Sequence, residues 1–167
     1  MAIPAVEGEE ALLPQGRHRT DLDEIEAYFV AAAPFSEERA IVFAAFRTWF
    51  TLIGQLIPSA RFWIDGGFVT HKPWAAPSDV DVMILCQAEV VDSLTTTEQD
   101  RLDQLLTIPA SPGRPRFQPM GGLVDAFIAY RSSPDDAPYW NAQWSRVKGA
   151  DGSEVLALSK GFLEVVT

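Results

Sequence analysis

The chain has 167 residues, of which 47% are hydrophobic and 22% are charged, a composition typical of one soluble domain with its own core. It carries 13 Lys and Arg against 23 Asp and Glu, and the resulting net charge of −10 argues against a broad nucleic-acid-binding face. The single cysteine, Cys86, and the two histidines, His18 and His71, exclude an internal disulfide and a metal site built from histidine and cysteine.

The sequence predicts neither export nor membrane insertion. No N-terminal segment has the charged-then-apolar form of a signal peptide. The most apolar stretch, residues 40–57, is interrupted by polar side chains and is too polar to span a bilayer. We therefore expect a cytoplasmic protein that does not associate with membranes. Residues 1–19 are predicted to be loosely ordered, and residues 20–167 to form a single domain.

The first predicted helix follows this loose segment. The stretch Asp21-Leu-Asp-Glu24 has the form of a capping box. Leu22, Ile25 and Phe29 then fall on one helical face, and Pro34 ends the helix.

A second helix is predicted directly after it. Ser36 is the expected N-cap, and Glu37 and Glu38 occupy the first turn, where the helix dipole favours acidic side chains. Pro58 ends this helix. Its apolar side chains cover more than one stripe, which predicts a well-buried helix.

Short apolar segments farther along the chain are predicted to be strands, over residues 61–65, 80–85, 123–130 and 161–166. Between them the sequence predicts a helix over 97–106, a Pro/Gly-rich loop over 109–122, a helix beginning at 133–136 and a turn at 151–152. In the last of these helices Trp140 and Trp144 share a face, a spacing more typical of a core than of a base-stacking platform. Loosely alternating helices and strands predict an α/β or α+β fold, with a small mixed sheet flanked by helices.

Two carboxylates open the second of these strands. Residues i and i+2 of a strand face the same way, so Asp79 and Asp81 are expected to project together. Magnesium prefers carboxylate oxygens and completes its shell with water and substrate phosphates. Asp-x-Asp alone is weak evidence, because the pair also fits a loop cap followed by a surface residue.

Two neighbouring features strengthen the prediction. Gly66-Gly67 follows a strand, and residues without side chains let backbone N–H groups approach an anion, although a simple tight turn has the same pattern. The residues that follow the glycines are expected to open a helical turn. Asp125 lies in the otherwise apolar stretch Leu123–Ile128, where a buried acid needs a partner or a metal unless it reaches solvent at a sheet edge.

The order Gly-Gly, eleven residues, Asp-hydrophobic-Asp-hydrophobic and a later strand aspartate resembles the nucleotidyltransferase superfamily that includes DNA polymerase beta. The wider chain is similar to short bacterial and phage nucleotidyltransferase-like proteins, through "LLPQGRHRTDLDEI", "FWIDGGFVTHKPWAAPSDVDVMI", "LVDAFIAY" and "KGFLEVV". Many members have serine where Gly67 stands, which weakens the case for phosphate affinity more than the resemblance itself. The resemblance implies a minimal nucleotidyltransferase-like fold.

The resemblance also implies a mechanism. Asp79 and Asp81 would hold Mg²⁺, or Mn²⁺, against the triphosphate of a nucleotide such as ATP. Asp125 would join them at a second metal and help to deprotonate the attacking hydroxyl. Gly66, Gly67, Lys72 and Ser78 would bind the nucleotide. A nucleoside monophosphate would pass to an acceptor in RNA, protein or a small molecule, or to another nucleotide, with release of pyrophosphate.

For several nearby residues the sequence pattern does not require a function. Lys72 fits a triphosphate contact and a solvated surface equally well. We expect Lys160 to be incidental to the site, Arg114 and Arg116 to solubilise their loop, and His71 to be incidental. The sequence singles out no residue for self-association.

Three rival functions remain in view. A haloacid-dehalogenase-type phosphatase also uses Asp-x-Asp, but there the apolar strand precedes the pair, whereas here residues 82–85 follow it. A glycosyltransferase with a metal-binding Asp-x-Asp is usually longer and gives the glycine pair no role. The third is a catalytically inactive relative that binds a nucleotide or a partner protein, for example in a toxin–antitoxin or phage-defence pair. The presence of all three aspartates argues against it, since unpaired buried acids destabilise a fold.

Overall fold

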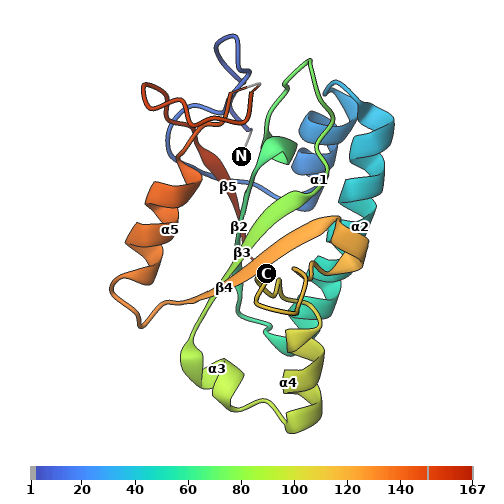
Figure 1. Cartoon of the computed structure of the whole chain (residues 1–167), viewed down its shortest axis with the longest axis vertical. Coiled ribbons are helices and arrows are strands. Elements are labelled where there is room, and N and C mark those ends of the chain that lie inside the picture. Colours follow the sequence, from blue (N-terminus) through green and yellow to red (C-terminus); the bar gives the residue numbers. More distant parts are fainter. Residues whose placement is uncertain (1–2, 150, 167) are drawn as a thin grey trace.

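The computed structural model describes residues 3–149 and 151–166. Over these residues the chain forms a five-stranded mixed sheet in the order β1-β5-β2-β3-β4 (Figure 1). The pairs β1–β5 and β3–β4 are parallel, and β5–β2 and β2–β3 are antiparallel. The strands are β1 (Arg17–Arg19), β2 (Arg61–Asp65), β3 (Val80–Cys86), β4 (Val124–Tyr130) and β5 (Phe162–Val166).

Helices cover both faces of this sheet, which confirms the predicted small α/β fold. The long helix α2 (Ser36–Leu56) lies on one face together with α1 (Leu22–Ile25), and α5 (Asp136–Trp144) lies on the other (Figure 1). The short helices α3 (Ala88–Asp92) and α4 (Thr96–Asp103) lie in the crossover between the parallel strands β3 and β4. Within the described ranges, none of the helices has the length and apolar character needed to cross a bilayer.

The alternation of side chains along the strands divides the core into two parts. Phe62, Ile64 and Val82 face α2 and belong to the larger apolar cluster, which includes Phe46 and Trp49 of that helix. The opposite face carries a smaller cluster, made of Trp63, Met83, Leu85, Ala129, Trp144 and Phe162. Because Asp65, Asp81 and Asp125 alternate with the residues of the larger cluster, they fall on the face of the smaller one.

The ends of the helices differ from the sequence predictions in several places. Asp21 caps α1 as expected, since its Oδ1 accepts from the Glu24 N–H at 2.8 Å, but the chain then continues as a π-helix, η1 (Glu26–Ala31). Ser36 is not an N-cap: Phe35 takes that position with a φ of 61° and no side-chain cap bond. The helix predicted over 97–106 is α4, Thr96–Asp103, so it begins one residue earlier and ends three residues earlier than predicted, behind a capping box formed by Thr95 and Glu98. Both α3 and β1 were missed, because each is too short to show a period.

The segment predicted to be loosely ordered contains regular structure where it is described. Residues 17–19 form β1 and pair with β5, and Leu12 and Leu13 are buried. The backbone oxygen of Ala11 accepts from the His71 N–H at 3.1 Å, which joins this segment to the chain beyond β2. The division at residue 20 stays a prediction.

The guanidinium of Arg39, on α2, is fully buried and donates to four backbone carbonyls. Its Nε donates to Pro34 at 2.7 Å, its Nη1 to Phe29 at 2.9 Å and Phe68 at 2.7 Å, and its Nη2 to Thr70 at 2.6 Å. Burial lowers the pKa of Arg39 to about 10, so the group stays charged at neutral pH. This one side chain therefore ties the end of η1 to the backbone that follows β2.

Replacing Arg39 by methionine is expected to lower the free energy of unfolding by about 3 kcal/mol or more, because buried carbonyls lose their donor. Urea denaturation followed by circular dichroism measures the change. Arg47→Met on the same helix is the matched control, since Arg47 is half exposed and pairs with Glu26 at 2.9 Å. The control should change the stability by about 1 kcal/mol or less. Equal losses in the two variants would contradict the role given to Arg39.

Candidate functional site

Three aspartates form a row at one end of the neighbouring strands β2, β3 and β4. Asp65 at the end of β2 is opposite Asp81 of β3, which is in turn opposite Asp125 of β4. Neighbouring strands lie about 4.8 Å apart, so the register brings these side chains together on one face. Asp65 and Asp125 are 5% and 6% exposed, and Asp79 directly precedes β3. The structure thus brings Asp81 and Asp125 together as predicted and adds Asp65, which the sequence analysis missed.

The negative charges of this buried row repel one another and need compensation. Burial, and after it the charges of Asp65, Asp79 and Asp125 in that order of effect, together raise the pKa of Asp81 to about 7. Burial also raises the pKa of Asp65, and the ammonium of Lys160 opposes that rise by forming an ion pair with it. At neutral pH Asp81 therefore holds a proton for part of the time.

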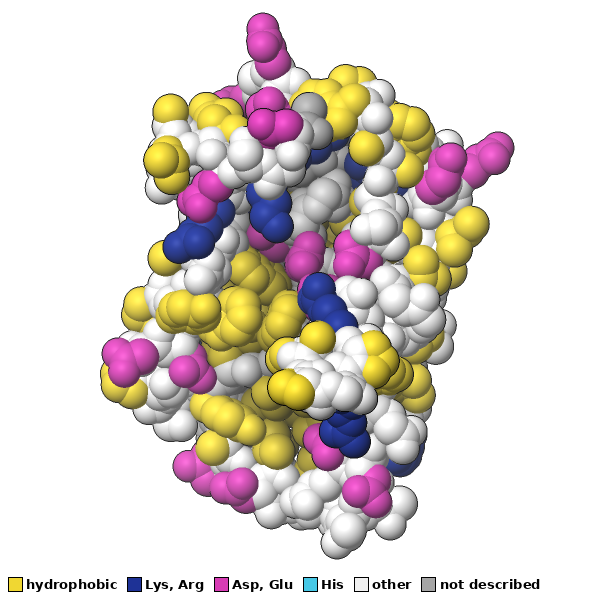
Figure 2. Space-filling model, viewed as in Figure 1, with side chains coloured by type: hydrophobic (Ala, Val, Ile, Leu, Met, Phe, Trp, Pro, Cys, Tyr) yellow, Lys and Arg dark blue, Asp and Glu magenta, His cyan; other side chains and the backbone are white. Residues whose placement is uncertain are grey.

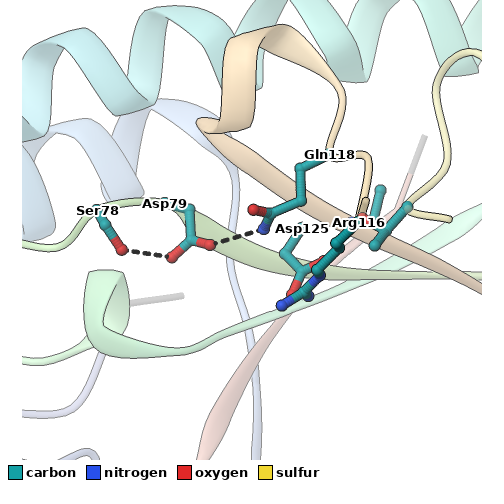
Figure 3. Close-up of polar contacts among 7 residues, drawn as sticks. Ser78, Asp79, Arg116, Gln118 and Asp125 are labelled. Carbon is teal, nitrogen blue, oxygen red and sulfur yellow. Dashed lines mark hydrogen bonds and ion pairs between the residues drawn. The ribbon is translucent and has the colours of Figure 1, made fainter. Parts of the chain in front are cut away.

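The Pro/Gly-rich loop supplies partners for Asp125 and for Asp79 (Figure 3). Arg116 forms an ion pair with Asp125, whose other oxygen accepts from the Thr107 hydroxyl at 2.7 Å. Gln118 donates through Nε2 to Asp79 at 3.0 Å. We expected Arg116 to solubilise its loop; the structure corrects this, because the half-exposed guanidinium lies against a candidate metal ligand.

The fourth predicted nucleotide contact, Ser78, is exposed. Its hydroxyl donates to the second oxygen of Asp79 at 3.0 Å (Figure 3). In the structure Ser78 orients that carboxylate, and it is not part of the described lining of the pocket beside the row.

The glycine pair forms the turn that was predicted. Gly66 has φ 82° and ψ −163°, a conformation that side chains exclude, and Gly67–Val69 form a 3₁₀ turn, η2. A Cβ placed on Gly66 would collide with the carboxylate of Asp81. The bonds from Arg39 to Phe68 and Thr70 hold this turn from the other side. The turn is therefore both close to the acidic row and rigidly supported.

A pocket of about 520 Å³ opens beside the row, between the sheet, α5 and the segment that follows α5. Its acidic end is formed by Asp65 and Asp81 next to the two glycines. Aromatic side chains form another wall: Phe127, Tyr139, Trp140 and Trp144. Figure 2 shows a hollow on this face, with hydrophobic side chains along its lower part and charged side chains of both signs toward its upper end.

All three lysines of the chain, Lys72, Lys148 and Lys160, line this pocket, together with Arg146. Lys160 is 7% exposed, which corrects our expectation that it is incidental. Lys72 donates to the backbone oxygen of Lys148 at 2.8 Å and so joins the glycine side of the pocket to the segment after α5. The scarcity of lysine in the sequence is the signal from which this cluster could have been predicted. In a chain of net charge −10 this is a local concentration of cations, of which Lys160 pairs with Asp65 and Arg146 with Glu154. Such a concentration would attract an anion that enters the pocket.

His71, which we expected to be incidental, has a structural role. Its Nε2 lies 3.0 Å from the backbone oxygen of Tyr28, and its ring stacks on the Tyr28 ring with centroids 4.7 Å apart. Burial lowers the pKa of His71, so the ring is neutral at physiological pH.

The side chains present suit a hard cation by their chemistry. Asp79, Asp81 and Asp125 offer the carboxylate oxygens that Mg²⁺ prefers, with no thiolate or imidazole beside them in the pocket lining or the acidic row. Among residues 3–149 and 151–166, however, no group of three or more carboxylate, imidazole or thiolate side chains is arranged to hold a metal ion. Two of the candidate ligands are bonded to Gln118 and Arg116 instead. Metal binding at this row would require those contacts to be released.

Gly66→Ala is expected to lower the free energy of unfolding by about 1–3 kcal/mol, since the backbone conformation is strained for any side chain. Gly67→Ala is the matched control, because a Cβ there would meet its nearest neighbour, Pro77, at an ordinary 3.9 Å. Thermal melts compare the two variants. A stable Gly66→Ala protein would show that the turn does not need glycine.

Stability should depend on pH through Asp81. Its pKa is raised from 3.8 to about 7 in the folded protein, so the folded state binds this proton more tightly than the unfolded chain. The stabilisation is complete below about pH 4 and is lost as pH rises through about 7. Asp81→Asn removes the titration and the repulsion, and is expected to raise the melting temperature at pH 8 more than at pH 5. Asp100→Asn, at an exposed position on α4, should have the same melting temperature as the parent protein at both pH values.

The chain was compared with protein-family models, curated proteins and solved structures. Residues 4–166 match the model of a family described as a family of unknown function (DUF6932). No curated protein and no solved structure matches the chain. Because the family model covers nearly the whole sequence, the chain belongs to the DUF6932 family.

Proposed function

We propose that this protein is a metal-dependent nucleotidyltransferase, which moves a nucleoside monophosphate from a nucleoside triphosphate to a hydroxyl acceptor and releases pyrophosphate. One observation carries the proposal: the acidic row adjoins a rigid glycine turn, and both adjoin a pocket lined by every lysine of an acidic chain. The resemblance of the motif order to the polymerase-beta superfamily points to the same chemistry.

Different residues would carry out different parts of this reaction. Lys72, Lys160 and the backbone of the glycine turn would offset the charge of the triphosphate. Bound Mg²⁺, held by Asp79, Asp81 and Asp125, would stabilise charge on the attacking and leaving oxygens. The acceptor oxygen forms a bond to the α-phosphorus, the bond to the pyrophosphate breaks, and the hydroxyl proton passes to a carboxylate of the row.

A second candidate is a nucleotide-binding or partner-binding module without turnover, of the kind found in toxin–antitoxin or phage-related systems. The contacts of Arg116 and Gln118 favour it, because they occupy two of the three carboxylates that the transfer needs. The two candidates share the pocket and differ in whether these contacts can be released.

Transfer is tested with each α-labelled nucleoside triphosphate and Mg²⁺ or Mn²⁺, added to a lysate that is then separated into RNA, protein and small molecules. Label should enter one fraction, and Asp79→Ala/Asp81→Ala should reduce it by about 100-fold or more. The control is Asp100→Ala/Asp103→Ala, which removes the same charge from exposed positions of α4.

Each outcome has a distinct meaning. Transfer that depends on Asp79 and Asp81 supports the proposal and identifies the class of acceptor. Magnesium-dependent nucleotide binding without transfer supports the binding module instead. Unchanged labelling in the double variant would overturn the assignment of these carboxylates.

A further inference from the structure

The two tryptophans of α5 have different surroundings. Trp144 is 6% exposed and packs edge-on against Phe162, as expected of a core residue. Trp140 is only partly buried and lines the pocket, with its ring centroid 5.2 Å from that of Phe127. Both side chains line the pocket, but Trp144 is buried in the smaller apolar cluster, whereas Trp140 packs against that cluster and is only partly buried.

This aromatic surface shares its cavity with the lysines. Lys148 follows α5 by four residues, and its backbone accepts from Lys72, so the helix and the glycine turn enclose one continuous space. The space is about 520 Å³, within the range of pockets that hold small ligands. A ligand that contacts both the aromatic wall and the lysines must join an aromatic ring to a compact polyanion.

Simpler ligands use only part of the pocket. Inorganic polyphosphate would satisfy the lysines and leave Trp140 and Phe127 facing water. An apolar aromatic molecule would bury those rings but would offer no negative charge to the lysines. A nucleoside triphosphate carries both groups on one small framework.

We propose that α5 is the base-recognition element: the nucleobase stacks on Trp140, and the phosphates extend toward Lys72, Lys148 and Lys160. The inference rests on the proposed function for the identity of the ligand. It concerns residues outside the acidic row and requires no turnover.

The test is calorimetric titration with ATP and, separately, with inorganic tripolyphosphate, both with Mg²⁺. Trp140→Leu removes the stacking surface and keeps an apolar side chain, so ATP affinity should fall by about 10-fold or more, in line with stacking measured on other proteins. Tripolyphosphate affinity should change by about twofold or less. Trp140→Phe keeps an aromatic face and should restore most of the ATP affinity, a rescue that a merely structural role does not predict.

Lys148→Gln provides the complementary variant. This variant should weaken the binding of ATP and of tripolyphosphate alike, because the proposal places the Lys148 ammonium toward the phosphates of either ligand. Melting temperatures of all three variants establish that they are folded before binding is compared.

Three results would overturn the inference. These are unchanged ATP binding by Trp140→Leu, an equal loss of tripolyphosphate binding in that variant, or no binding of ATP, GTP, CTP or UTP by the parent protein. The outcomes also separate the inference from the proposed function. Base-dependent binding without transfer supports the inference alone, whereas transfer that Trp140→Leu leaves unaffected supports the function alone.

Discussion

Mutual repulsion among the aligned carboxylates is the constraint on which the rest of the site depends. The strand register leaves Asp65, Asp81 and Asp125 no way to separate, so their charge must be offset where they lie. Lys160 and Arg116 each pair with an outer member, and the central one has its pKa raised to about 7. An arrangement that opposes stability in this way, beside a pocket, is typical of a functional site.

The two sides of the row are supported in different ways. On the glycine side, the buried Arg39 fixes the turn through carbonyl contacts that belong to the body of the fold. On the other side, Arg116 and Gln118 come from a loop rich in proline and glycine, and the Arg116 side chain is 49% exposed. The glycine side is therefore preorganised, whereas the cover over the carboxylates can be exchanged for another cation at little cost in packing. This asymmetry suits a site that must admit a metal and a substrate in turn.

The sequence predicted those parts of the site that depend on local patterns. The prediction for Asp79 and Asp81 follows from strand periodicity, and that for Asp125 from its place in an otherwise apolar strand. The turn follows from the pair Gly66-Gly67 at the end of a strand. Other parts depend on pairing between distant segments. Asp65 looked like the polar end of a strand, because its place in the row exists only once β3 lies beside β2. The burial of Lys160 requires β5 to lie between β1 and β2, which no local pattern indicates. Arg39 was hidden for a related reason, since its partners are carbonyls up to 31 residues away.

The distribution of charge also bears on the acceptor. The lysines come from separate segments and meet in one pocket, whereas the chain as a whole carries a net charge of −10. Screening confines the attraction of such a cluster to about 8 Å at physiological ionic strength, so it acts on groups that enter the pocket. A long nucleic acid would extend beyond this range over an acidic surface that repels its phosphates. For the proposed transfer, the electrostatics therefore favour an acceptor that presents its hydroxyl on a small molecule or a short protruding segment. The nucleotide, as the more highly charged of the two proposed substrates, would lie among the lysines.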